Sequence, residues 1–540
     1  MRSADLIFTG GSIITADDGG PTEPSHLAVS DGRIIAVGSD EVLGHRGPDT
    51  AMIDLAGRCL MPGFVEAHTH PTQDQTLYLD CVVDIRPVTT CPTADDVDRA
   101  IKRALDVAPA GEPLVFYGLD VLLQTGYPTP TLEWLDRIGP DRPIIIWQNS
   151  GHQAWANTAA LRNAGLTDAT PDPIGGSFER DTDGHLTGTV YEAPGVEAVV
   201  APILFAALQG PEALAKQHAA LSAQGVTMCS DMAFSPAMRP LVAALYEQNL
   251  ARVRMRVYET STPALTTDYP LANGDDLFQQ IGIKIWVDGS PWVGNIDTSF
   301  PYLNTPATAA LGLGHDHRGH ANYTEAQLAE IVGAYYPRGW QIACHVHGDN
   351  GVDKILDAYE RALRAHPRPD HRLRLEHCGA MTAAQFQRAA RMGVTCSLFV
   401  DHLYYWGDVL ADDLFGADKG GHWVRTKSAL DAGMRVSFHN DSPVTREEPL
   451  RNMSAAVTRT SRTGRVLAPE ERITVEQAIR AQTIDAAWQL FADDITGSLT
   501  PGKYADLVIL DRDPRHVDPL DLPGIDVHAT YLAGQPTYRR

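Results

Sequence analysis

Several polar residues in this sequence could bind a divalent metal ion, and most of them follow an apolar run. They comprise two histidine pairs with i, i+2 spacing, a further histidine, a lysine and an aspartate: His68 and His70, His345 and His347, His377, Lys284 and Asp441. An i, i+2 pair on a β-strand points both imidazoles to the same face. A divalent metal needs three or more nitrogen or oxygen ligands at about 2.0–2.2 Å. A single histidine could belong to the core, but the joint pattern predicts a metal site.

The elements that position these residues are apolar, often β-branched runs. We expect eight strands, at 61–70, 225–231, 251–259, 281–289, 340–348, 371–378, 393–400 and 434–441. Helical patterns separate most of them, as in 349–363, and Thr474 with Gln477 forms a capping box before another helix. This alternation predicts an α/β fold, a (β/α)₈ TIM barrel. The carboxyl ends of the strands then meet at one mouth, where the polar residues would converge.

The two ends of the chain differ from this alternating middle. Residues 1–60 and 495–540 contain short strands with tight turns, which predicts a small β-sandwich domain built from both termini around a barrel at 61–494. Residues 71–220 are too many for a βα loop and contain strands and helices of their own. We expect them to form a large insertion after the first barrel strand that covers the barrel mouth and sets substrate choice.

Lys284 is unusual because a lysine inside an apolar strand must bury its ammonium group or give up its charge. One interpretation is an ion pair with a nearby carboxylate. The other is that carbon dioxide converts the amine to a carbamate, an anionic oxygen ligand that could bridge two metal ions. Asp288 is a further possible ligand, although the Gly–Ser that follows it is more typical of a turn.

Composition narrows the partners and the compartment. The formal net charge of −24 argues against nucleic acid and anionic membranes as partners, because both need a basic face. The seven cysteines are scattered without a CxxC pair, which disfavours a disulfide framework or a Cys₄ zinc site. With no signal peptide or membrane span in the sequence, we expect a cytoplasmic protein. We also expect a homo-oligomer.

Several motifs resemble the amidohydrolase superfamily, in the branch that contains N-substituted formamide deformylase. They are MPGFVEAHTH, KIWVDGS, HVHGDNGVD, LEHC, SFHNDSPV and PGKYADLVILD, and they extend the resemblance from about residue 5 to 515. Two segments of the insertion also match this branch, at 149–161 and 175–192. The run SPWVGN after KIWVDG departs from the glycine- and serine-rich run expected there.

The resemblance implies a metal site and a divalent cofactor. The implied ligands are His68, His70, Lys284, His345, His377 and Asp441, with Lys284 as the carbamate. His347 stands where the branch commonly has an apolar residue, so we place it behind the ligands. One or two zinc ions suit these donors, although iron, manganese and nickel are also compatible with them.

The expected mechanism is attack by a metal-activated water, whose pKa falls from about 15.7 to near 7. Asp441 would accept the proton of this water and deliver it to the leaving amine, and His152 would donate a hydrogen bond to the oxyanion. Trp147, Trp286 and Tyr404 are expected near the pocket, which favours a substrate with an apolar or aromatic group.

Three functions are compatible with these residues. The first is a metal-dependent hydrolase of a non-peptide C–N bond, in an N-substituted amide or formamide. The second is a cyclic-amide hydrolase, resembling a hydantoinase, or a deaminase at the same site. The third is a non-catalytic scaffold on the same fold, which would be expected to lose ligands, whereas all six are present.

Overall fold

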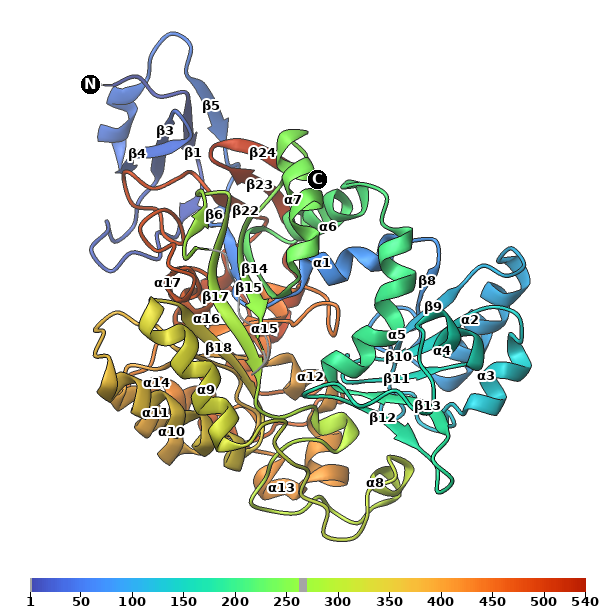
Figure 1. Cartoon of the computed structure of the whole chain (residues 1–540). Helices are drawn as coiled ribbons and strands as arrows, with labels where there is room; N and C mark the ends of the chain where they lie inside the picture. The colour runs from blue at the N-terminus through green and yellow to red at the C-terminus, as the bar shows by residue number, and fades with distance from the viewer. Residues whose placement is uncertain (1, 262–269) are drawn as a thin grey trace.

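A computed structural model describes residues 2–261 and 270–540, and its centre is a ring of eight parallel strands (Figure 1). The strands hydrogen-bond in chain order, which makes a nearly closed barrel. They are β7 (Phe64–Glu66), β14 (Val226–Phe234), β15 (Arg254–Thr260), β17 (Phe278–Trp286), β18 (Gln341–Val346), β19 (Arg374–His377), β20 (Thr395–Leu398) and β21 (Val436–Phe438). Asn440 N donates to Glu66 Oε1 at 3.0 Å, joining the end of the first strand to the loop after the last one. The predicted α/β barrel is confirmed.

The first and last strands are shorter than the sequence pattern predicted. Residues 61–70 do not form one strand, because β6 (Cys59–Pro62) pairs with the C-terminal β22 (Leu507–Leu510) before β7 begins. Gly63 separates the two strands at a close approach: a Cβ there would lie 2.2 Å from Thr227. The last strand ends at Phe438, so that the residues up to Asp441 lie in the loop beyond it.

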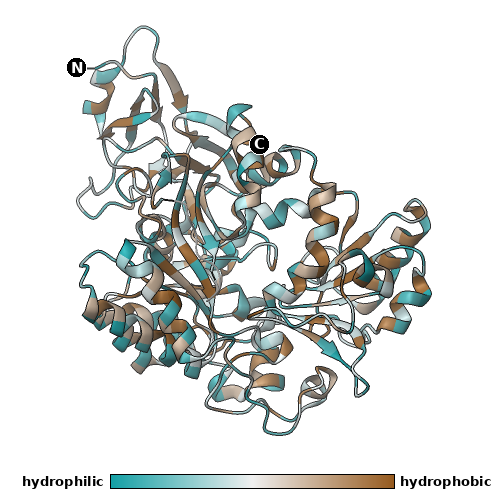
Figure 2. Ribbon diagram, viewed as in Figure 1, coloured by the Kyte–Doolittle hydropathy of each residue, from teal (hydrophilic) through white to brown (hydrophobic). Residues whose placement is uncertain are grey.

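Helices alternate with the barrel strands as expected. Helix α10 (Asp349–Ala365) buries Val352, Ile355 and Leu356, and the box of Thr474 and Gln477 begins α16 (Val475–Ala481). Figure 2 shows hydrophobic residues along the barrel strands, whereas the surrounding helices carry both kinds of residue. Among the described residues, no single helix is long and apolar enough to cross a membrane; α5 (Glu192–Ala207) and α6 (Glu212–Ala223) pass by length and composition only as a pair, bent by 102°.

Two small sheets lie where the ends of the chain come together, and the second of them combines strands from both ends (Figure 1). One contains β4 (Arg33–Gly38), β3 (His26–Ser30), β1 (Leu6–Thr9) and β5 (Ala51–Asp54); the other contains β2 (Ser12–Ile13), β6, β22, β23 (Val527–Leu532) and β24 (Gln535–Arg539). Phe8 and Leu27 from the first sheet share a buried cluster with Leu507 and Tyr531 from the second. The assignment of these sheets to a β-sandwich domain stays a prediction.

The segment between β7 and β14 builds a third unit beside the barrel. Its sheet has the order β12 (Ser177–Arg180), β13 (Leu186–Tyr191), β11 (Gln153–Ala156), β10 (Ile144–Gln148), β9 (Leu114–Leu119) and β8 (Val82–Asp84). Helices α2 (Ala94–Val107), α3 (Leu132–Ile138), α4 (Thr158–Asn163) and α5 accompany it. Apolar clusters of its own pack these elements together. The insertion therefore contains strands and helices of its own, as expected, with β9 and β10 among the strands.

Candidate active site

The six expected metal ligands line one cavity of about 430 Å³ at the carboxyl ends of the barrel strands. His68 and His70 follow β7, Lys284 lies near the end of β17, His345 lies in β18, His377 ends β19, and Asp441 follows β21. The chain turns after Asp441, whose carbonyl accepts a hydrogen bond from Val444 N at 2.8 Å. His377 and Asp441 have positive φ angles of 69° and 53°, a backbone strain that is common at functional sites.

The ligand atoms converge closely enough to hold a divalent metal ion. Asp441 Oδ1 lies 3.2 Å from His68 Nε2 and 3.1 Å from His70 Nε2, while Lys284 Nζ lies 3.1 Å from His68 Nε2. His345, His347 and His377 form a second buried group, with ligand atoms within 4.8 Å of one another. Among the described residues, His377 Nε2 is buried without a hydrogen-bond partner. Imidazoles and a carboxylate in this arrangement fit a divalent metal ion.

The protonation states that the surroundings favour are those that metal binding needs. Burial lowers the pKa values of His345 and His377 well below the ordinary value, so both rings are neutral near pH 7. Burial would raise the pKa of Asp441, but the neighbouring His68 and His70 outweigh it and hold the carboxyl ionised. Burial also lowers the pKa of Lys284 to about 8, which makes its neutral amine accessible.

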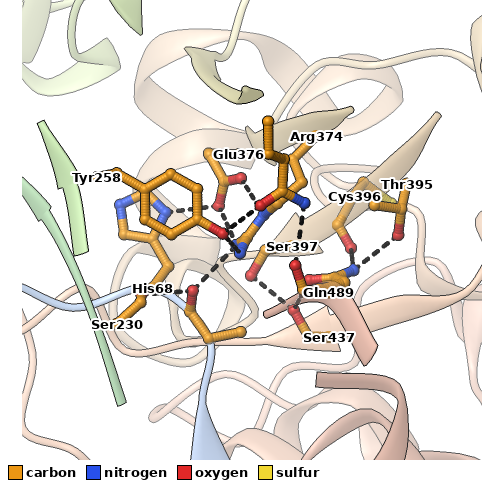
Figure 3. A network of polar contacts seen from close by, with 12 residues as sticks. His68, Ser230, Tyr258, Arg374, Glu376, Thr395, Cys396, Ser397, Ser437 and Gln489 are labelled. Carbon is orange, nitrogen blue, oxygen red and sulfur yellow. Dashed lines mark hydrogen bonds and ion pairs between the residues drawn. The ribbon is translucent and has the colours of Figure 1, made fainter. Parts of the chain in front are cut away.

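A buried network behind the cavity orients His68 (Figure 3). The ring donates from Nδ1 to Glu376 Oε2 at 2.6 Å, which leaves Nε2 facing the cavity. Arg374 donates to both oxygens of Glu376, at 2.7 and 2.9 Å, and to Tyr258 Oη at 3.1 Å. Such partners fix the orientation of a metal-binding histidine. The sequence analysis missed this pair, although Arg374 and Glu376 have i, i+2 spacing in an apolar strand.

His439 is a second residue that the sequence analysis missed. Its Nε2 lies 3.0 Å from His377 Nδ1, its Nδ1 lies 2.8 Å from Ser397 Oγ, and its ring stacks on His68 with centroids 4.6 Å apart. It follows β21 directly, so its position in SFHND was the available signal. With His68 and His377 it forms another buried group able to bind a metal.

His347 and Asp288 lie behind the residues that line the cavity. The ring of His347 stacks on His377 with centroids 4.9 Å apart, outside the cavity lining. Asp288 accepts from the backbone N–H groups of His347 at 2.9 Å and Gly348 at 2.7 Å. These bonds hold the chain after β18, while Asp288 itself lies in a bend after the end of β17, where a turn was expected.

The aromatic residues expected at the pocket divide into two groups. Trp147 and Trp286 line the cavity, as does His152. Tyr404 is not among the residues that line the cavity: it lies in α12 (Asp401–Val409), where the Arg451 guanidinium lies 4.6 Å from its ring centroid. Its place near the pocket stays a prediction. In the same helix, the indole of Trp406 donates to Asp120 Oδ2 at 2.8 Å.

Helix α5 of the insertion contributes an apolar wall to the cavity. The residues on this wall recur at helical spacing: Val196, Val200, Ala201, Leu204, Phe205 and Leu208. Glu192 and Glu197 are the charged residues of this helix that line the cavity, and burial raises the pKa of the Glu197 carboxyl. The insertion and the barrel therefore enclose the same cavity, one with mostly apolar side chains and the other with metal-binding groups.

Comparison with known proteins agrees with this geometry. The model of the amidohydrolase family matches residues 51–538. N-substituted formamide deformylase of Arthrobacter pascens is 30% identical, over 99% of this chain and 98% of its own length. Protein LONG AFTER FAR-RED 3 of Arabidopsis thaliana is 29% identical, over 99% of this chain and 92% of its own. An uncharacterized metal-dependent hydrolase from Pyrococcus horikoshii has the same fold, with a TM-score of 0.73 and 24% identity, covering 95% of this chain and 99% of that one. This chain belongs to the amidohydrolase family and is a hydrolase that acts on carbon–nitrogen bonds.

Proposed function

We propose that this enzyme hydrolyses the C–N bond of an N-substituted amide or formamide that carries an apolar or aromatic group. The observation that carries the proposal is the cavity itself, in which metal-binding side chains face the apolar wall of α5, Trp147 and Trp286. The similarity to N-substituted formamide deformylase supports the same substrate class. An apolar substituent on the amide nitrogen would pack against this apolar wall, and the scissile bond would then lie at the histidines.

The charges around the cavity favour an uncharged substrate. Among the described residues that line it, Lys284 is the only lysine or arginine, whereas Glu192, Glu197 and Glu259 are acidic. The sequence also has no lysine or arginine at residues 262–269. A substrate carboxylate would therefore lack the basic partner that buried anions need. This argues for a simple N-substituted amide over an N-acyl amino acid.

His68, His70, Lys284, His345, His377 and Asp441 would hold one or two divalent ions, with zinc as the first expectation. When bound, such an ion supplies a hydroxide nucleophile at neutral pH and polarises the substrate carbonyl. Lys284 would act as a carbamate: its neutral amine attacks carbon dioxide, an N–C bond forms, and one proton leaves to solvent. The resulting anionic oxygens would replace the bare amine that now lies 3.1 Å from His68 Nε2.

Asp441 is the proposed proton carrier. Its carboxylate is ionised and lies within 3.2 Å of two histidine nitrogens, at the edge of the cavity where water would attack. It would accept a proton from the attacking water and give it to the departing amine. No other carboxylate that lines the cavity in the described part of the chain lies among the proposed metal ligands.

The test combines metal analysis with a substrate panel. The purified protein would be assayed for metal content and for hydrolysis of N-substituted formamides, hydantoins and aminopyrimidines. We expect bound divalent metal and turnover of the formamides. Turnover of hydantoins or aminopyrimidines alone would establish the cyclic-amide hydrolase or the deaminase instead. A fully metallated protein without turnover of any panel member would refute the proposed substrate class.

A further inference from the structure

His152 and Glu192 lie opposite each other at the ends of two neighbouring strands in the sheet of the insertion. Strands β11 and β13 are antiparallel and place Gln153 opposite Tyr191, so the next pair along the ladder is His152 and Glu192. The backbone N–H of Glu192 donates to the His152 carbonyl at 2.8 Å. Side chains of directly opposed residues project from the same face, and His152 Nδ1 donates to Glu192 Oε2 at 2.7 Å. Two hydrogen bonds therefore join this pair.

The Glu192 carboxylate is itself held in one position. Its other oxygen, Oε1, accepts from Asn295 Nδ2 at 3.0 Å, in the loop after β17. Gly289 permits this close approach, because a Cβ there would lie 2.3 Å from Glu192 Oε1. Glu192 also has a φ angle of 62°, which is strained for a residue with a side chain. The surrounding contacts must therefore maintain this backbone conformation.

This arrangement decides which edge of the His152 ring is available to a substrate. Nδ1 is occupied by Glu192, so Nε2 is the nitrogen left for the cavity that both residues line. The His152 ring lies beside His345, with centroids 4.9 Å apart. In a neutral imidazole with its proton on Nδ1, Nε2 is an acceptor. The site thus presents an acceptor where the sequence predicted a donor to the oxyanion.

We infer that His152 accepts a hydrogen bond from the amide N–H of the substrate, and that Glu192 is the residue that positions it. The inference rests on the proposed amide hydrolysis and narrows its substrates to secondary amides, which have one N-substituent and one N–H. An N,N-disubstituted amide has no proton for Nε2 and places its second substituent against the ring. A buried acceptor left without its partner disfavours such an analogue.

The experiment compares two probes that differ at the amide nitrogen: N-benzylformamide and N-benzyl-N-methylformamide. The kcat/KM ratio of secondary to tertiary amide is measured for the wild type, His152→Ala and Glu192→Gln. Glutamine offers one acceptor where the carboxylate offers two, so it cannot satisfy both His152 and Asn295. We expect the ratio to fall by about 10-fold or more in both variants, because the loss of the hydrogen bond lowers kcat/KM for the secondary amide only.

His185→Ala is the matched control, because His185 pairs with Asp168 at 2.9 Å on the exposed surface of the same insertion. It should leave the ratio unchanged. Because both rates come from one preparation, partial loss of folded protein or metal cancels from each ratio.

The outcomes separate this inference from the proposed function. Hydrolysis of the secondary amide with the same ratio in His152→Ala would overturn the acceptor role while keeping amide hydrolysis. An equal loss for both probes in His152→Ala is what a donor to the carbonyl oxygen would give, and it also overturns the inference. A metallated wild type that hydrolyses neither probe would overturn the proposed function, and the inference with it.

Discussion

Replacing Glu376 with glutamine should weaken metal binding and lower the stability of the metal-free protein. The carboxylate lies between His68 and Arg374, and all three side chains are fully buried (Figure 3). Glutamine keeps the size of the side chain but removes the negative charge and one acceptor oxygen. Arg374 would then be a buried cation without a counter-charge, and His68 would lose the acceptor that fixes its Nδ1 proton.

The size of the expected loss of stability follows from the pKa of Glu376. Burial would raise the pKa of Glu376, but the charge of Arg374 and the hydrogen bond from His68 lower it from 4.5 to about 2. At about 1.4 kcal/mol per pKa unit, this corresponds to about 3 kcal/mol of stability. Because the folded value is the lower one, this stability is present above pH 4.5 and is lost as the pH falls toward 2. Breaking a buried ion pair costs a similar amount, about 3–5 kcal/mol.

The assay measures unfolding and metal affinity on the same variants. Glu376→Gln should lower the free energy of unfolding by about 3 kcal/mol and weaken metal affinity by about 10- to 100-fold. Asp506→Asn is the matched control, since Asp506 forms an equally buried pair with Arg254, at 2.7 and 3.1 Å, away from the cavity. It should lose stability without losing metal affinity. A Glu376→Gln protein that binds metal as tightly as the Asp506→Asn protein would refute the orienting role.

Three further predictions concern the proposed ligands. The double variant His68→Ala, His70→Ala should lose metal and activity but keep its fold, as measured by elemental analysis and circular dichroism. Lys284→Ala should lose activity, and short carboxylic acids such as propionate should partly restore it by replacing the carbamate; a lack of rescue at restored metal content would argue against a carbamate. Asp441→Asn should lose about 10² or more in kcat, compared at equal metal content; a fully metallated variant with near wild-type kcat would exclude Asp441 as the proton carrier.

Local patterns were sufficient to predict the barrel and the convergence of its polar residues. An apolar strand that ends in a polar residue is visible within about ten residues of sequence, as at Lys284 and His377, and parallel strands bring such ends together. The same patterns could not show where a strand changes sheet. Gly63 lies between β6 and the first barrel strand, where the space for a side chain is taken by Thr227, which is distant in sequence. Only the folded chain contains that information.

The residues that the sequence analysis missed act through partners from other elements. Glu376 orients His68, which follows β7 and donates a hydrogen bond to it. Glu192 can position His152 because the register of β11 and β13 sets the two residues opposite each other. The surroundings of Tyr404 have the same origin. The sequence does not show that Arg451, from a distant segment, lies 4.6 Å from its ring centroid.

The division of the cavity between two units implies that metal binding and substrate choice can vary separately. The proposed ligands come from barrel strands and their loops, whereas α5, Trp147, His152 and Glu192 come from the insertion. Asn295 is one link between them, since it lies in the loop after β17 and donates a hydrogen bond to Glu192. That loop contains the run SPWVGN, where this chain departs from the pattern expected for its branch. On the proposed function, a change in this loop would therefore reach the substrate through Glu192 and His152.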